Sequence, residues 1–380
     1  MSDNTLQRLH DAGQSIWLDY IDRTMLHNGD LQRRIREDAL TGMTSNPSIF
    51  EKALAEGTAY DAQIKAEDGE LTGMQLFEKI ATTDVRDACD AFRQVHERTH
   101  GGDGFVSIEV SPGAAHDARA TVAEGTRLWK AVDRPNVMIK VPGTTEGAVA
   151  VRQLTAAGVN VNITLLFSID AYKSVMDAYM AGLEDRVSAG QDISRIHSVA
   201  SFFVSRVDTE VDKRLDAAAA AHPANEKTLK SLRGKAAIAN AKLAYRTFQD
   251  GLASPRWKAL AAKGATVQRP LWASTSTKNA AYRDVMYVEE LIGPDTVNTM
   301  PPQTIDAFRD HGKVERTVDK NLDAARLELQ ALEQNGVSLE AVTDKLLVDG
   351  LASFQKAFET LLVGLQKKTA SLGRQLVASR

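Results

Sequence analysis

Short runs of apolar and β-branched residues recur along the chain and alternate with stretches whose apolar residues lie three and four positions apart. The first pattern predicts strands and the second predicts helices, such as those expected over residues 83–98 and 145–157. We expect eight strands, over residues 15–21, 39–45, 104–110, 136–141, 158–166, 197–205, 265–273 and 295–300. Eight strands that alternate with helices predict an α/β fold, the parallel (β/α)8 TIM barrel. A doubly wound open sheet is the alternative, but it usually has fewer strands.

Two helical segments exceed what a minimal barrel needs. Residues 208–263 are rich in Ala, Lys and Glu and are interrupted near His222, so we expect two or more helices before the seventh strand. Residues 314–372 are expected to be helical, with a turn at Asn335 and Gly336. A barrel of about 250 residues with these additions fits a chain of 380 residues. We therefore expect a single domain over residues 1–380, with a helical insertion at about 208–263 and C-terminal helices at about 314–372.

Polar residues occupy alternate positions in several predicted strands. Alternate side chains of a strand face opposite sides, so each strand has one polar face and one apolar face. Helices around a parallel sheet must cover apolar residues, and this places the polar face inside the barrel. The inward residues are then Asp19, Thr44, Asn46, Ser107, Glu109, Lys140, Asn162 and Thr164. A barrel built for stability alone would hold Val, Ile and Leu here, so we expect a functional site. A half-exposed antiparallel sheet would also show this pattern, but the intervening helices disfavour it.

Lys140 is the most informative of these inward residues. A free lysine is almost entirely an ammonium ion at pH 7, whereas desolvation favours the neutral amine that attacks a carbonyl group. A lysine inside a barrel, with no arginine in its own strand, suits Schiff-base formation. A structural ion pair with Glu109 explains Lys140 equally well when this residue is considered alone. The hydroxyl and amide groups around it, which suit the hydroxyls of a sugar, favour the catalytic interpretation.

Composition and charge exclude several classes of protein. The net charge is −4, so nothing indicates binding to nucleic acid. Cys89 is the only cysteine, which excludes an intramolecular disulfide and a cysteine-only zinc site. The N-terminal residues have no apolar region typical of a signal peptide, and no run of about 18 apolar residues suggests a membrane span. We expect a cytoplasmic protein that does not bind membranes.

Seven short motifs, in order along the chain, resemble those of transaldolases. They are TSNPS (44–48), VSIEV (106–110), IKVP (139–142), NVNITLLFS (160–168), SFFVSR (201–206), ASTSTKN (273–279) and DTVNTMP (295–301). The similarity extends from about Ile16 to Pro301, and the longer-chain bacterial members are the most similar. One such motif would be weak evidence, whereas seven in order are strong evidence.

The resemblance implies class I aldolase chemistry without a metal or another cofactor. Lys140 would form a Schiff base with a ketose phosphate, and Asp19 would take the proton of the C4 hydroxyl. Cleavage would release an aldose phosphate and leave a dihydroxyacetone unit on Lys140, which a second aldose phosphate then accepts. Glu109 would act through a water molecule oriented by Thr164. In the pentose phosphate pathway such a transfer converts sedoheptulose 7-phosphate and glyceraldehyde 3-phosphate to erythrose 4-phosphate and fructose 6-phosphate. The enzyme would be a monomer or a homodimer.

The resemblance also implies how the substrate is held. Asn46 and Asn162 would bind hydroxyls, Thr44 and Ser201 would line the site, and Arg206 would bind the phosphate. An exposed ion pair of Arg206 with Asp208 or Asp212 is the alternative. The family's usual second arginine is absent from ASTSTKN, where Ser274, Ser276 and Lys278 are available instead.

Three other functions compete with transfer. Residues 96–100 read HERTH, the H-E-x-x-H pattern of zinc proteases, but Gly101 and Gly102 would end that helix at His100. Fructose 6-phosphate aldolases of the same superfamily cleave without transfer, and they have glutamine at the position of Glu109 and tyrosine at that of Phe203. A barrel that only binds a sugar phosphate would not need Lys140 and Asp19 together.

Overall fold

The protein is a closed barrel of eight parallel strands in a computed structural model that describes residues 4–55, 57–67 and 71–373. Each strand pairs with the next along the chain, and β8 pairs with β1. The strands are β1 (Gln14–Asp19), β2 (Leu40–Thr44), β3 (Val106–Glu109), β4 (Val137–Pro142), β5 (Val161–Leu166), β6 (Ser198–Phe203), β7 (Gln268–Ala273) and β8 (Thr296–Met300). All eight overlap the predicted strands, so the (β/α)8 barrel is confirmed and the open sheet is excluded.

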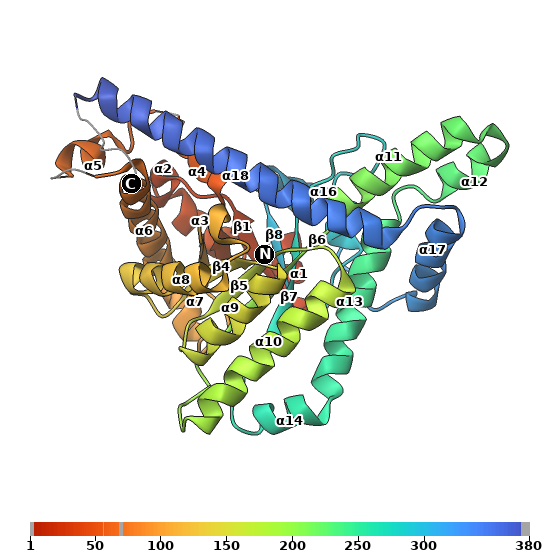
Figure 1. Cartoon of the computed structure of the whole chain (residues 1–380), viewed down its shortest axis with the longest axis horizontal. Coiled ribbons are helices and arrows are strands. Elements are labelled where there is room, and N and C mark those ends of the chain that lie inside the picture. Colours follow the sequence, from red (N-terminus) through yellow and green to blue (C-terminus); the bar gives the residue numbers. More distant parts are fainter. Residues whose placement is uncertain (1–3, 56, 68–70, 374–380) are drawn as a thin grey trace.

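Helices surround the barrel (Figure 1). Up to β5 they are α1 (Thr5–Asp11), α2 (Arg23–His27), α3 (Asp30–Glu37), α4 (Pro47–Ala55), α5 (Asp61–Ala66), α6 (Gly73–Ala91), α7 (Arg93–Arg98), α8 (Ala118–Val132) and α9 (Thr145–Ala156). After β5 they are α10 (Ile169–Ser188), α11 (Ser205–Ala221), α12 (Glu226–Ser231), α13 (Ala236–Ala253), α14 (Pro255–Ala261), α15 (Met286–Glu289), α16 (Pro302–His311), α17 (Leu322–Gln334) and α18 (Leu339–Ser371). Two short 3-10 helices cover Pro112–Ala114 and Pro223–Asn225.

Side-chain caps start helices soon after the strands end. Thr144 follows β4 closely, and its hydroxyl accepts a hydrogen bond from the backbone N–H of Gly147, which fixes the first turn of α9. Ser168 does the same for α10 after β5, with Ala171 as the donor. The chain therefore leaves the carboxyl ends of these strands along defined paths, which leaves the mouth of the barrel open for a site.

The additional helices agree in part with the prediction. Four helices, α11 to α14, precede β7 as expected, and α11 ends at Ala221, next to the predicted break. The helix predicted from residue 314 is wrong for residues 314–321, because the backbone N–H groups of Thr317 and Val318 both bond to the carbonyl of Ile292. The predicted turn at Gly336 is confirmed, with φ at 79°. The long helix α18 crosses the barrel and contacts α4, α6, α11 and β5 (Figure 1).

The register of the strands brings three polar residues side by side. Lys140 on β4 is level with Glu109 on β3 and with Asn162 on β5. Asp19 and Thr44 are level on β1 and β2. These residues come from positions far apart in the sequence, so it is closure of the barrel that makes one site of them.

Close packing inside the barrel extends below this polar layer. The fully buried ring of Trp17 lies against the backbone of Gly42, where a Cβ atom would come within 2.5 Å of the indole nitrogen. That nitrogen donates a hydrogen bond of 2.9 Å to Asp103. Gly42 is therefore required here for close packing.

No helix of the described residues is long and apolar enough to cross a lipid bilayer.

Candidate active site

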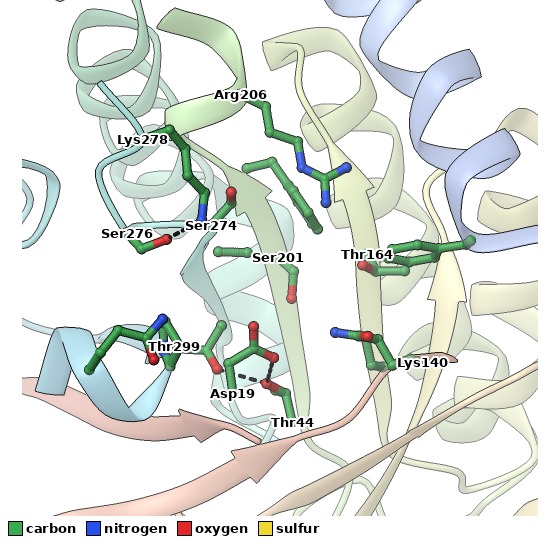
Figure 2. A pocket seen from close by; sticks show the side chains of 16 residues that line it. Asp19, Thr44, Lys140, Thr164, Ser201, Arg206, Ser274, Ser276, Lys278 and Thr299 are labelled. Carbon is green, nitrogen blue, oxygen red and sulfur yellow. Dashed lines mark hydrogen bonds between the residues drawn. The ribbon is translucent and has the colours of Figure 1, made fainter. Parts of the chain in front are cut away.

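A cavity of about 260 Å³ opens at the carboxyl ends of the strands. It gathers ten of the twelve residues that we predicted for the site, namely Asp19, Thr44, Asn46, Lys140, Thr164, Ser201, Arg206, Ser274, Ser276 and Lys278. Figure 2 shows Arg206 and Lys278 toward one end of this cavity, with Asp19, Thr44 and Lys140 toward the other. The inward direction predicted for the polar face of the strands is thus confirmed for the residues that line it.

Lys140 lies in the wall of the cavity and is 5% exposed. Its Nζ atom donates a hydrogen bond of 2.9 Å to the carbonyl oxygen of Ser45 and lies 3.3 Å from Oε2 of Glu109. The ion pair considered as an alternative is therefore present. Because Lys140 also faces the cavity, this pair does not exclude a reaction at Nζ, and it places a carboxyl group beside the amine.

Glu109 is beside the cavity and does not line it. Its side chain is 5% exposed, and burial raises the pKa of Glu109, while the charge of Lys140 opposes this rise. Neither carboxyl oxygen accepts a hydrogen bond from the described residues, and the buried hydroxyl of Thr164 also has no partner among them. Three buried polar atoms near Lys140 thus keep free hydrogen-bonding capacity, which an active site can use.

Asp19 is the acid at the end of β1. The hydroxyl of Thr44 donates to Oδ1 of Asp19 at 2.8 Å, and it lies 2.7 Å from the hydroxyl of Thr299 on β8. A hydroxyl has one proton to donate, so the proton between the two threonines must come from Thr299. This chain of hydrogen bonds orients one oxygen of Asp19 and leaves the other available.

Asn162 is fully buried beneath the cavity. Its side-chain nitrogen donates to the hydroxyl of Ser107 at 2.9 Å, and its oxygen accepts from Ser201 at 2.7 Å. Ser201 lines the cavity, so Asn162 reaches it through this hydroxyl. We predicted that Asn162 holds substrate hydroxyls; its side chain bonds to Ser107 and Ser201 and is not part of the cavity lining.

Arg206 brings a positive charge to the other end of the cavity. It stands in the first turn of α11, and its guanidinium lies 5.2 Å from the centre of the Phe203 ring. Burial lowers the pKa of Arg206, and the charge of Asp19 opposes this effect. The structure gives it no ion pair with any described residue, so the exposed pair with Asp208 or Asp212 is not formed. An unpaired cation on a cavity wall suits an anionic ligand.

Lys278 belongs to the segment after β7 and is exposed. Its Nζ donates to the hydroxyl of Ser276 at 2.8 Å, and both residues line the cavity (Figure 2). Ser274 lies between β7 and these two residues, and its backbone is left-handed, with φ at 56°. Serine hydroxyls and one lysine therefore stand where the family resemblance implies an arginine.

Sequence reasoning missed other parts of the wall. Besides Phe203, the cavity is lined by Ala273, Thr299, Pro301, Gln303 and Phe354. The polar residue Thr299 could have been found as a strand residue, but its strand carries polar residues at both parities. Phe354 comes from α18 and had no signal in the sequence, since its helix is simply amphipathic.

Two alternative assignments can be judged from the contacts. Asp22, a second acid near β1 that could compete with Asp19 as the general acid or base, lies beyond the strand and caps α2 by accepting from Met25 N–H. The helix that carries His96 ends at Arg98, and His100 lies beyond it with φ at 52°. His96 instead contacts the carbonyl of Asp103 at 2.7 Å. In the described part of the chain, no three His, Cys, Asp or Glu residues are grouped so that they could hold a metal ion.

The fold and the site together define a class. In (β/α)8 barrel enzymes the active site lies at the carboxyl ends of the strands, and here that end holds a buried lysine, two carboxyl groups and an unpaired arginine. The chain is therefore expected to be a barrel enzyme for a polar, anionic substrate.

Comparison with known proteins makes the assignment specific. A model of the transaldolase/fructose-6-phosphate aldolase family matches residues 16–365. A protein of Thermobifida fusca named transaldolase is 50% identical over 370 residues, which cover 96% of this chain and 98% of that one. Transaldolase 1 of Streptomyces coelicolor is 48% identical (97% and 96% covered), and a transaldolase of Trichodesmium erythraeum is 45% identical (98% and 99%). The chain belongs to the transaldolase/fructose-6-phosphate aldolase family, and the resemblance that the seven motifs predict is confirmed.

Proposed function

We propose that this enzyme is a transaldolase, a transferase that moves a dihydroxyacetone unit from a ketose phosphate to an aldose phosphate. The observation that carries this function is the place of Lys140, which is buried, faces the cavity and has a carboxyl group 3.3 Å from its Nζ. Family membership supports sugar phosphates as substrates, and the relatives named transaldolase support transfer. The reaction is sedoheptulose 7-phosphate plus glyceraldehyde 3-phosphate to erythrose 4-phosphate plus fructose 6-phosphate.

The first half of the reaction forms and breaks bonds at Lys140. Its neutral amine adds to the ketone carbon, and the carbinolamine loses water to give the Schiff base. Asp19 takes the C4 hydroxyl proton, the C3–C4 bond breaks, and its electron pair enters the enamine that stays on Lys140. The aldose phosphate leaves with the new aldehyde at C4. Asp19 suits this role because Thr44 holds one of its oxygens and leaves the other available.

The second half reverses these steps with another aldose phosphate. The enamine carbon attacks the aldehyde, Asp19 returns its proton to the new alkoxide, and water hydrolyses the Schiff base. Glu109 and Thr164 act on both the loss and the addition of water, through a water molecule between them. Their free buried oxygen atoms support this role, and the raised pKa of Glu109 suits a group that gives and takes a proton.

The substrate lies along the cavity with its phosphate at Arg206. Arg206, Lys278, Ser274 and Ser276 bind the phosphate, and Asn46, Thr44 and Ser201 bind hydroxyls, with Asn162 holding Ser201. The unpaired charge of Arg206 supports this orientation. In this orientation the reacting ketone lies near Lys140, at the other end of the cavity (Figure 2).

Borohydride trapping tests the covalent step. Fructose 6-phosphate with borohydride should add mass to the peptide that contains Lys140 and should inactivate the enzyme. Lys140→Ala should abolish trapping, whereas Lys278→Ala, which removes the other lysine of the cavity, should trap at high substrate concentration. Label on another lysine, or none in the wild type, would contradict the mechanism.

A two-substrate assay distinguishes transfer from simple cleavage. A transaldolase should consume fructose 6-phosphate only when an aldose acceptor such as erythrose 4-phosphate is present. Release of free dihydroxyacetone without an acceptor, at a rate equal to transfer, would instead assign the enzyme to the aldolase branch. Glu109 and Phe203, where the aldolases have glutamine and tyrosine, support transfer.

We also propose that the enzyme works in the cytoplasm, as a monomer or a homodimer, without a metal or another cofactor. Analytical ultracentrifugation tests the oligomeric state. Activity that survives exhaustive dialysis against a chelator tests the absence of a metal. The chain is further proposed to be one domain, because α18 contacts β5 of the barrel as well as α4 and α11 on either side. A single calorimetric unfolding transition is expected.

A further inference from the structure

The two basic residues of the cavity come from different parts of the chain. Arg206 stands in the first turn of α11, whereas Lys278 belongs to the segment of residues 274–289 that joins β7 to the end of α15, here called the β7–α15 segment. From Ser274 to Val285 this segment has no regular secondary structure. One phosphate can meet both side chains only if the segment is fixed relative to α11.

At its start the segment is tied to the beginning of α11 by backbone bonds. The N–H of Val204 donates to the carbonyl of Ala273, and the N–H of Ser205 donates to the carbonyl of Ser274, both at 3.0 Å. The hydroxyls of Ser205 and Ser274 also lie 3.0 Å apart. These bonds hold the first residue of the segment, but they lie before Lys278 and do not fix its position.

Beyond Lys278, two tyrosines attach the segment to two carboxyl groups of α11. Tyr282 donates to Oδ2 of Asp212 at 2.5 Å, and Tyr287 donates to Oδ2 of Asp208 at 2.8 Å. Asp208 and Asp212 are four residues apart, so they lie on one face of α11. Lys278 therefore stands between two attachments to the helix that carries Arg206.

The carboxyl groups themselves are held from the other side. Oδ1 of Asp208 accepts from Ala237 N–H at 2.8 Å, and Oδ1 of Asp212 accepts from Gly234 N–H at 3.0 Å. Each group thus uses one oxygen for the chain around the start of α13 and the other for a tyrosine of the segment. Both residues are buried, at 1% and 6% exposure. Burial of two carboxyl groups costs free energy, which these hydrogen bonds and the ion pair of Asp212 with Arg233, at 3.8 Å, offset.

A second cavity of about 390 Å³ adjoins this arrangement. Lys278, Asn279 and both tyrosines line it together with Asp208 and Asp212, and Lys278 is the residue that it shares with the active-site cavity. Lys278 therefore borders both cavities, and the two tyrosines border the second one.

We propose that Tyr282 and Tyr287, held by Asp212 and Asp208, are positioning residues that keep Lys278 and Arg206 directed at one phosphate. This role rests on the proposed function, because it presupposes a phosphorylated substrate in the cavity. It accounts for the missing second arginine. A lysine is a point charge on a flexible stem, so its position must come from its surroundings, whereas an arginine fork has its geometry built in.

The test compares phosphorylated and unphosphorylated substrates in Tyr282→Phe, Tyr287→Phe and the double variant. The matched control is Tyr245→Phe, which loses a 3.0 Å hydroxyl bond to the carbonyl of Pro294, away from the β7–α15 segment. The double variant should raise KM for fructose 6-phosphate on the order of tenfold, because Lys278 would lose its charge-assisted bond to the phosphate. The kcat/KM for unphosphorylated fructose should stay within about twofold, and the control should change neither.

Direct titration with inorganic phosphate separates this role from the function it rests on. Phosphate binding to the double variant should be weaker by a similar factor, whether or not the wild type transfers a dihydroxyacetone unit. Equal phosphate affinity in the wild type and the double variant would overturn the positioning role. An equal fall in kcat/KM for both sugars would also overturn it, because it would indicate general damage. If the double variant does not fold, Tyr282→Phe alone decides, since that ring is only partly buried. Absence of trapping on Lys140 in the wild type would contradict the transaldolase function alone.

Discussion

The carboxyl group of Asp208 should make the stability of this enzyme depend on pH. Burial raises the pKa of Asp208 from 3.8 to about 7, although Ala237 N–H and the Tyr287 hydroxyl donate hydrogen bonds to it. The folded state therefore holds this proton more tightly than the unfolded chain. The resulting stability is fully present below the unfolded pKa of 3.8 and is lost as the pH rises through about 7.

The size of the effect follows from the difference between the pKa of Asp208 in the folded and in the unfolded chain. Between pH 5 and pH 8 a little under two pKa units of it are lost, at about 1.4 kcal/mol each, which gives roughly 2.5 kcal/mol. Asp208→Asn keeps a side-chain oxygen and has no titrating proton. Urea unfolding at pH 5 and pH 8 should therefore show that the wild type loses roughly 2.5 kcal/mol more than the variant does.

Other buried acids also titrate, so the comparison needs a control for charge. Asp323→Asn removes a carboxylate that is 95% exposed on α17, and its pH dependence should match that of the wild type. The reasoning is refuted if Asp208→Asn and the wild type lose the same free energy of unfolding between pH 5 and pH 8.

Three further substitutions test the site and the barrel. Glu109→Gln should slow transfer and shift the balance toward simple cleavage, because an amide cannot carry the proton; unchanged transfer kinetics with an acceptor would remove its role. Phe354→Ala should lower the free energy of unfolding by about 3 kcal/mol and reduce kcat/KM, because it opens a wall of the cavity while leaving Lys140 to be trapped; wild-type kcat/KM would show that α18 adds nothing to the site. Gly42→Ala should cost at least about 2 kcal/mol in urea unfolding, since the new methyl group meets the buried ring of Trp17, and an unchanged midpoint would contradict that packing.

The sequence predicts most of the site because alternation in strands is a local property. Where one parity is polar and the other apolar, as around Lys140 and Thr164, the inward face is decided by the helices outside. In β8 the same reasoning fails, because Asn298 and Thr299 are both polar. The structure points Thr299 into the cavity, while Asn298 bonds with Thr275 and Gln14. Only the pairing of neighbouring strands settles such a case.

Contacts between distant segments are the part that the sequence does not predict. Nothing in the pattern of apolar residues around Phe354 indicates that this side chain reaches a cavity at the carboxyl ends of the strands, the last of which ends at Met300. The non-helical residues 314–321 were missed for the same reason, because their conformation depends on bonds to Ile292. Local propensity decides an element only when tertiary contacts do not override it.

The position of Phe354 on α18 has a consequence for how the enzyme becomes active during synthesis. The last strand of the barrel ends at Met300, but the helix that supplies Phe354 extends from Leu339 to Ser371. The ribosome therefore makes every strand of the barrel, including those that carry Lys140 and Asp19, before it makes Phe354. Until α18 has been made, this part of the cavity wall is missing. The cavity that holds Lys140 is therefore completed by a residue that is made after every strand of the barrel.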